Sequence, residues 1–153
     1  MDIIAFGGTF FGQLLVALVL GMLIGTERTL AHKTAGLRTY GLVSMGSCLF
    51  IVVVLALKET LGISSADLTR VIAGLITGVG FLGAGVIILR DQTLVGLTTA
   101  AGLWVASGIG VAVGFQLYII AFYTTLLTLL TFTVFWFLEK EVTHIGPQTG
   151  DTK

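Results

Sequence analysis

Long apolar runs without charged side chains, separated by short charged segments, dominate the chain. Residues 3–26, 39–57 and 71–89 each carry no charge. The next uncharged run, residues 92–138, is too long for one membrane crossing, which takes about 20 apolar residues. Gly114-Phe115-Gln116 is the turn that best divides it. The pattern therefore predicts five transmembrane helices, at about residues 6–26, 39–57, 71–89, 95–113 and 116–138.

Composition agrees with this pattern. Of the 153 residues, 56% are hydrophobic and 10% are charged, and the mean hydropathy is +1.05. Soluble domains carry about 25% charged residues, so this chain cannot cover a water-facing surface. The runs are also too long and too apolar for the strands of an outer-membrane barrel. We expect an all-α polytopic membrane protein, a compact bundle of five helices over residues 1–138, with a short disordered tail at 139–153.

Basic residues are distributed unevenly between the two ends of these spans. If the N-terminus lies outside, the inner side holds six basic residues and the outer side holds only Lys58 and Arg70. Positive charge collects on the cytoplasmic side of membrane proteins, so we expect the N-terminus outside and the tail in the cytoplasm. The six inner residues are Arg28, Lys33, Arg38, Arg90, Lys140 and Lys153.

The third span contains a glycine pattern with two readings. The stretch Gly78-Val-Gly80-Phe-Leu-Gly83 matches the G-x-G-x-x-G of dinucleotide-binding loops. That motif needs a preceding strand and an acid about 20 residues later, and here it lies inside an apolar span with no acid between Asp91 and Glu139. We therefore interpret the glycines as helix-packing positions, since small residues let membrane helices approach closely.

A helical wheel separates the third span into faces. One sector of the wheel holds only bulky residues, and we expect it to face lipid. Its residues are Val71, Ile72, Leu75, Val79, Leu82, Val86 and Leu89. Small residues occupy the other faces, which we expect to contact neighbouring helices. The fourth span is rich in small residues all round and should be the central helix, whereas the bulky fifth span should be peripheral. The glycines that we expect at helix contacts are Gly21, Gly25, Gly74, Gly78, Gly80, Gly83, Gly85 and Gly102.

Polar residues gather at the cytoplasmic ends of four spans. We expect them to form one interacting group around the glycine-rich core, able to bind an ion, an anionic group or a partner. The alternative is that each charged side chain caps its helix or reaches separately to the membrane surface. The residues of this predicted cluster are Glu27, Arg28, Arg38, Thr39, Arg90, Asp91, Thr98 and Thr99.

Other chemistry has less support in the sequence. Glu27 and Asp91 could offer two carboxylates to Mg²⁺, but three nearby arginines disfavour a bare divalent cation, so we expect no cofactor and no firm metal site. His32 and His144 have no evident metal-ligand partner, and Cys48 is expected to pack inside its span. We expect no enzymatic activity. With a net charge of zero, the chain offers no basic surface to nucleic acid.

Four motifs in order resemble the MgtC/SapB family of bacterial inner-membrane proteins. They are "GMLIGTER", "AGLRTYGLV", "GVGFLGAGVIILRD" and "GLTTAAGLWVASGIGVAVG", and together they extend from Gly21 to Gly114. The sequence departs from many members at Val95, where those members have a basic or polar residue. The matching residues are Gly21, Gly25, Glu27, Arg28, Gly36, Leu37, Arg38, Thr39, Gly80, Phe81, Gly83, Gly85, Arg90, Asp91, Gly96, Thr98, Thr99, Ala100 and Trp104.

The resemblance implies a five-helix core in the inner membrane that is linked to magnesium limitation. For some members it also implies intracellular survival and an effect on the F-type ATP synthase, roles that the longer members with a soluble C-terminal domain carry. We therefore predict a non-enzymatic protein of magnesium homeostasis. It would act through helix contacts with itself, most simply as a dimer, or with a membrane partner. The alternative is a small channel or transporter for Mg²⁺ or another ion.

Overall fold

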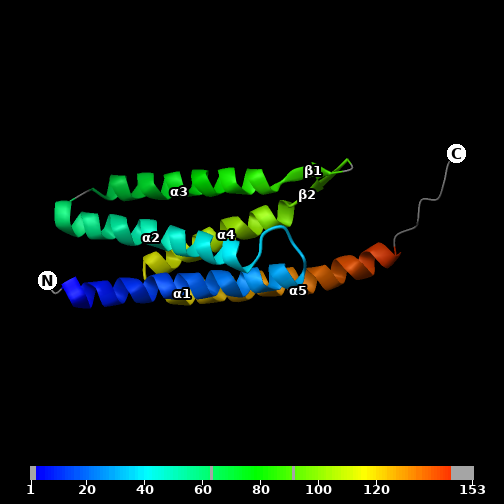
Figure 1. Ribbon diagram of the computed structural model, residues 1–153, viewed down its shortest axis with the longest axis horizontal. Coiled ribbons are helices and arrows are strands. Elements are labelled where there is room, and N and C mark those ends of the chain that lie inside the picture. Colours follow the sequence, from blue (N-terminus) through cyan, green and yellow to red (C-terminus); the bar gives the residue numbers. More distant parts are fainter. Residues whose placement is uncertain (1–2, 63, 91, 146–153) are drawn as a thin grey trace.

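The structure is a computed structural model, and it describes residues 3–62, 64–90 and 92–145, with side-chain burial described within residues 10–134. It is an all-α bundle with one short β-hairpin (Figure 1). The elements are α1 Ile3–Leu30, α2 Leu37–Leu61, α3 Ser65–Val86, β1 Ile88–Arg90, β2 Thr93–Val95, α4 Leu97–Gly114 and α5 Tyr118–Ile145.

The helices have the length and composition of membrane spans. Four stretches in the described part of the chain are long and apolar enough to cross a bilayer, namely Phe10–Leu30 of α1 and all of α2, α3 and α4. In α5, the apolar stretch with described side chains is Tyr118–Val134. The helix itself continues to Ile145, so the first residues after Leu138, where the tail was expected to begin, are helical. The protein is therefore a multi-pass membrane protein.

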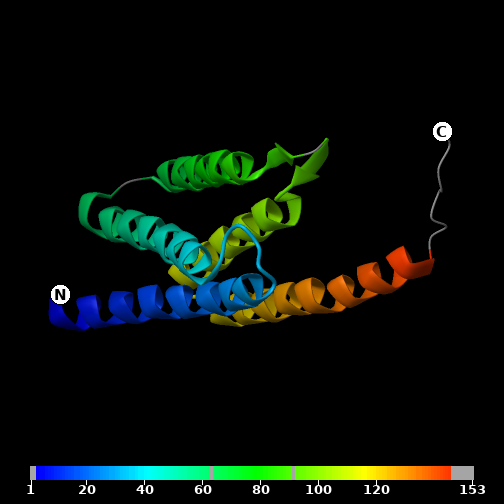
Figure 2. The ribbon, with the colours of Figure 1, turned by 45° about the vertical axis from the view of Figure 1, so that its right-hand side comes forward.

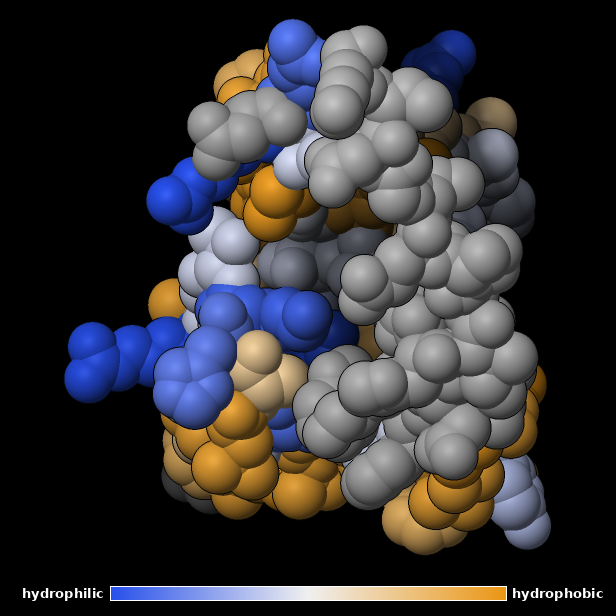
Figure 3. Space-filling view, turned by 90° about the vertical axis from the view of Figure 1, so that its right-hand side faces the viewer, coloured by the Kyte–Doolittle hydropathy of each residue, from blue (hydrophilic) through white to orange (hydrophobic). Residues whose placement is uncertain are grey.

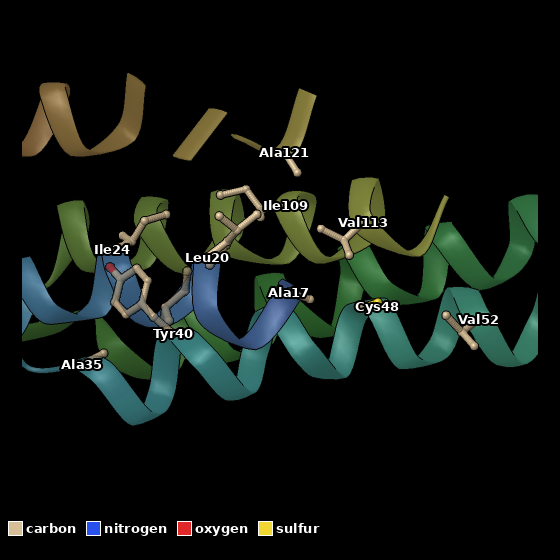
Figure 4. Close-up of a cluster of buried hydrophobic side chains, with 12 residues drawn as sticks. Ala17, Leu20, Ile24, Ala35, Tyr40, Cys48, Val52, Ile109, Val113 and Ala121 are labelled. Carbon is tan, nitrogen blue, oxygen red and sulfur yellow. The ribbon is translucent and has the colours of Figure 1, made fainter. Parts of the chain in front are cut away.

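The core lies between α1, α2 and α4, where glycines bring the backbones together. A Cβ added at Gly21 of α1 would lie 2.6 Å from the carbonyl oxygen of Tyr40, and one added at Gly25 would lie 2.6 Å from the Cα of Leu37. Side chains such as Ile24 and Ile109 fill the space beside these contacts (Figure 4). Close backbone approach of this kind is the usual basis of helix association in lipid.

The central position of α4 is confirmed. Half of its spanning window is buried, which is the largest share among the four candidate spans. It packs against α1, α2, α3 and α5. α5 lies on the outside of this group and exposes bulky side chains, including Ile119 and Leu127, as expected for a peripheral helix.

The segment between α3 and α4 differs from the prediction. We expected helix to residue 89 and again from residue 95, but α3 ends at Val86 and a two-stranded antiparallel hairpin follows. Its register pairs Ile88 with Val95 and Arg90 with Thr93. Gly96 then begins α4 with a φ of +97°, a left-handed conformation that favours glycine. The run of β-branched and leucine side chains on either side of Arg90 suits strands better than a helix end.

The orientation of α3 is the reverse of the one expected from the helical wheel. Val79, in the bulky sector expected to face lipid, is 6% exposed, and Val86 packs against the core cluster. The small residues Ala73, Gly80 and Ala84 are exposed instead. The wheel separated the faces but assigned them to the wrong neighbours. In this chain α3 turns the side that carries Val79, Gly83 and Val86 to the bundle and leaves the stripe of Ala73, Gly80 and Ala84 uncovered.

The helices alternate in direction along the bundle. The start of α1 and the end of α5 lie at opposite ends of the molecule (Figures 1 and 2). The loop between α1 and α2 lies toward the same end as the hairpin. Viewed onto that end, hydrophilic residues form a group bordered by hydrophobic side chains (Figure 3). This end corresponds to the side that the charge pattern predicts to be cytoplasmic.

Candidate functional site

The best-defined polar site is built around Arg28, in the last turn of α1. Its side chain is inside the bundle, because only 3% of the residue is exposed. The guanidinium donates through Nε to one carboxylate oxygen of Glu27 and through Nη2 to the other, at 2.6 Å for the second bond. This two-pronged pairing neutralises a charge that would otherwise be costly at a buried position. Arg28 therefore does not reach to the membrane surface as a separate helix-end residue.

Two aromatic residues from other helices complete this site. The guanidinium carbon of Arg28 lies 3.7 Å from the ring centre of Phe132 in α5, a cation–π contact. Tyr40 of α2 is fully buried, and its hydroxyl donates to the carbonyl oxygen of Thr99 in α4 at 3.2 Å. A Cβ at Gly102 would collide with the Tyr40 hydroxyl and would lie 2.8 Å from Phe132. Gly102 therefore provides the space in which both rings fit.

We refer to Glu27, Arg28, Tyr40, Thr99, Gly102 and Phe132 as the Arg28 site. Four helices contribute to it, so it fixes the relative positions of α1, α2, α4 and α5 at this end of the bundle. The charges of Glu27 and Arg28 are already paired with each other, and the Tyr40 hydroxyl already donates to the carbonyl oxygen of Thr99. Such a site is well suited to holding one helix arrangement. A free anion would have to displace Glu27 to bind the guanidinium.

The other predicted cluster residues are not part of the contacts that define the Arg28 site. Arg38 and Thr39, in the first turn of α2, are exposed and line two neighbouring hollows. Arg90 is at the end of β1, and Thr98 is exposed in the first turn of α4. Asp91 lies outside the described residues. Of the eight cluster residues, the structure thus brings Glu27, Arg28 and Thr99 into one site.

The predicted packing glycines fall into two groups. Gly21, Gly25 and Gly102 are at the close contacts described above, and Gly83 of α3 makes an ordinary contact with Ala100, 3.5 Å from an added Cβ. The remaining four have no neighbouring atom among the described residues within 4 Å of an added Cβ, so the structure shows no packing contact for them. These four are Gly74, Gly78, Gly80 and Gly85.

Several buried polar residues at the helix contacts were not predicted from the sequence. Gln13 of α1 is 1% exposed, and its side-chain nitrogen donates to the carbonyl oxygens of Val113 and Gly114 at 3.4 and 3.3 Å. Gln13 is the lone amide in the first apolar run, a signal that could have marked it as buried, because an unpaired amide in lipid is costly. Two buried oxygens, Gln13 Oε1 and Ser44 Oγ, have no hydrogen-bond partner among the described residues.

Serine and threonine side chains in the spans mostly bond to a backbone carbonyl of their own helix. The Thr77 hydroxyl donates to the carbonyl oxygen of Ala73 at 2.9 Å. Ser47 is an exception in part, because its hydroxyl bonds to the carbonyl of Val43 and also shares a 2.7 Å hydrogen bond with Ser107 of α4. Cys48 is buried and free, in agreement with a packing role.

The described residues contain no group of three or more histidine, cysteine or acidic residues that could hold a metal ion. Glu27 lies at the Arg28 site as the partner of a guanidinium, and this positive neighbour disfavours a cation at the same carboxylate. The fold and site together define a multi-pass helical membrane protein. Small residues allow its helices to approach closely. The buried Arg28 joins α1 to α5, and the Tyr40 hydroxyl joins α2 to α4.

Sequence comparison places this membrane protein in a family. The chain matches the MgtC family over residues 14–141 and therefore belongs to it. No solved structure matches the chain.

Three relatives illustrate the range of the family. YhiD of Escherichia coli strain K12, whose name describes it as a candidate magnesium transporter, is 42% identical over 82% of this chain and 60% of its own length. SrpB of Synechococcus elongatus is 36% identical over 84% of this chain and 75% of its own. MgtC of Salmonella typhimurium is 41% identical over 67% of this chain and 42% of its own. The matches to YhiD and MgtC thus cover less than two thirds of those proteins.

Proposed function

We propose that this chain is a non-enzymatic protein of the bacterial inner membrane that takes part in magnesium homeostasis and in adaptation to low Mg²⁺. Membership of the MgtC family supports the connection with magnesium. The proposed mode of action is contact between helices, either in a dimer of this chain or with another membrane protein.

The small-residue face of α3 supports this mode of action. Ala73, Gly80 and Ala84 are exposed, and the space beside Gly80 and Gly85 is open. Within lipid, such a face allows close approach of a second helix, and packing then supplies the association energy. The core glycines of α1 and α4 already show this kind of contact inside the chain.

Cysteine crosslinking tests the contact directly. Cys48 is buried, so a single cysteine introduced at Gly80 is the accessible thiol in this region. We expect Gly80→Cys to give a crosslinked dimer, or a crosslinked heteromer, in native membranes. A cysteine at Phe122, exposed on α5, is the matched control and should give none. Equal crosslinking at both positions would contradict a specific α3 contact.

A second candidate function is transport of Mg²⁺ or another ion. The name of YhiD favours it, and so do the polar residues at the contacts of α1, α2 and α4. Two of these residues have an oxygen without a hydrogen-bond partner in the described part of the chain. Liposomes that hold only this protein distinguish the two functions. A regulatory protein should show the Mg²⁺ flux of empty liposomes. A transporter should show a flux that falls when Ser107, whose hydroxyl bonds Ser47, is changed to valine.

A further inference from the structure

A long apolar groove lies between α2 and α3. Its volume is about 830 Å³, within the range of ligand-binding pockets. Leu42, Gly46 and Phe50 line it from α2, and Leu75, Gly78 and Leu82 line it from α3. Glycines in both walls leave the groove open, since a Cβ at Gly46 or Gly78 would have no atom of the described residues within 4 Å.

The dimensions of the groove match one leaflet of a bilayer. From Arg38 to Phe50, α2 rises about 18 Å at 1.5 Å per residue. One leaflet contributes half of a hydrocarbon core of about 30 Å, or about 15 Å. The groove therefore has the length needed by one acyl chain that begins at the membrane surface and ends near the midplane.

The polar end of the groove has the chemistry that recognises a phosphate. Arg38 and Thr39 line this end, both are exposed, and Arg38 forms no ion pair with any other described residue. The same two residues also line a second hollow of about 310 Å³, together with Thr29, Gly36 and Leu37. This hollow is at the start of α2. The Leu37 amide there already donates to Thr29 Oγ1, and the positive end of the helix dipole adds to the attraction of an anion. A guanidinium is well suited to bind phosphate oxygens.

We propose that this groove is a binding site for an anionic phospholipid, with an acyl chain along α2 and α3 and the phosphate at Arg38. The apolar groove and the second hollow share Arg38 and Thr39 in their linings, so the acyl chain and the phosphate of one amphipathic molecule can both lie against these residues. The bound lipid would fill the space between α3 and α2 and hold α3 in place. This site does not depend on whether the protein regulates or transports.

The test uses the full-length protein purified in neutral detergent, with phosphatidylglycerol as the probe. We expect native mass spectrometry to show one retained phosphatidylglycerol and little phosphatidylcholine, and added phosphatidylglycerol to raise the melting temperature. Inorganic phosphate alone should neither be retained nor raise the melting temperature, because it has no acyl chain to occupy the groove. Equal retention of the neutral lipid, or stabilisation by phosphate alone, would overturn the proposal.

Matched variants separate the two parts of the site. Arg38→Gln should weaken phosphatidylglycerol binding about tenfold or more, and Lys33→Gln, an exposed cation in the loop before α2, should not. Gly46→Leu fills the groove and should reduce retention of the lipid, whereas Gly108→Leu, also without neighbours but outside the groove, should leave it unchanged. Unchanged lipid binding in Gly46→Leu, together with loss of a dimer, would assign the groove to a second copy and overturn the lipid site.

Discussion

Gly110 of α4 faces the backbone of α2 so closely that a Cβ there would collide with the carbonyl oxygen of Ser44. Neither backbone can retreat easily, because Gly114 is in a similarly close contact with Ile51 one turn further on. Gly108 is on the same helix, two residues away, in open space. The two glycines therefore have different physical roles although the sequence around them is similar.

This difference predicts opposite effects of the same substitution. Gly110→Ala should force α4 away from α2 and lower the free energy of unfolding by about 1–3 kcal/mol, the range for overpacking a core. Gly108→Ala should leave stability unchanged or raise it by up to about 1 kcal/mol through helix propensity. Thermal unfolding in detergent measures both. Equal melting temperatures for the two variants would show that α4 does not pack on α2 at this depth.

Arg28 and Arg38 are both arginines at the same end of the bundle, but only Arg28 is buried. Arg28→Ala removes the partner of Glu27 and the cation over Phe132, so we expect a loss of about 3 kcal/mol, as for other broken buried pairs. Arg38→Ala should change stability by less than about 0.5 kcal/mol in lipid-free detergent.

A double-mutant cycle identifies the source of the Arg28 effect. Arg28→Ala combined with Glu27→Gln should cost less than the sum of the two single changes, with a coupling of about 1 kcal/mol or more. Thermal unfolding in detergent again supplies the measurement. Strict additivity would mean that Glu27 and Arg28 act independently, as helix-end residues exposed to water would.

At the scale of elements, the hairpin after α3 sets where α4 begins. Gly96 has a φ of +97°, and a Cβ at this position would collide with the carbonyl of Val86 at the end of α3. Gly62, at the end of α2, also has a positive φ of +65°, but no atom of the described residues lies within 4 Å of an added Cβ. The first glycine is constrained by conformation and by contact, and the second by conformation alone.

Alanine at the two positions should therefore have graded effects. Gly62→Ala should cost about 1 kcal/mol, the penalty for a left-handed conformation. Gly96→Ala should cost clearly more, because it also separates α3 from α4. Circular dichroism during heating gives the two melting temperatures. A larger effect at Gly62 would show that the hairpin does not join α3 to α4 in the way described.

A comparison of the helices with the sequence pattern shows which parts of the fold and of the Arg28 site could be predicted from the sequence alone. Uncharged runs and the turn at Gly114-Phe115-Gln116 predicted helices that overlap all five observed ones, because length and hydropathy are properties of each segment alone. The pairing of Glu27 with Arg28 could be anticipated from adjacency. The contact of Phe132 with Arg28 and the hydrogen bond from Tyr40 to Thr99 could not, because they join different helices and form only after tertiary packing. The direction in which α3 faces was wrong for the same reason, since a wheel gives the faces of a helix and not its neighbours.

At the scale of the whole molecule, the two ends of the bundle carry different sites, so the orientation in the membrane determines which compartment each site faces. The Arg28 site, the mouth of the α2–α3 groove and the hairpin lie toward one end, and Lys58 and Arg70 belong to the other end, near the connection between α2 and α3. If the first end is cytoplasmic, the groove opens to the inner leaflet. The excess of basic residues at that end favours this orientation.

Two exposed lysines at opposite ends of the bundle test the orientation. In intact cells, a membrane-impermeant thiol reagent should label Lys58→Cys and not Lys33→Cys, while inverted vesicles should give the reverse pattern. Both side chains are exposed, so access from one side of the membrane, not burial, controls the labelling. Native Cys48 is buried and should contribute no signal, which the unmodified protein verifies. Labelling of Lys33→Cys from outside would invert the topology. It would place the proposed phosphate site in the outer leaflet, and the Arg28 site would then lie away from the cytoplasmic magnesium pool.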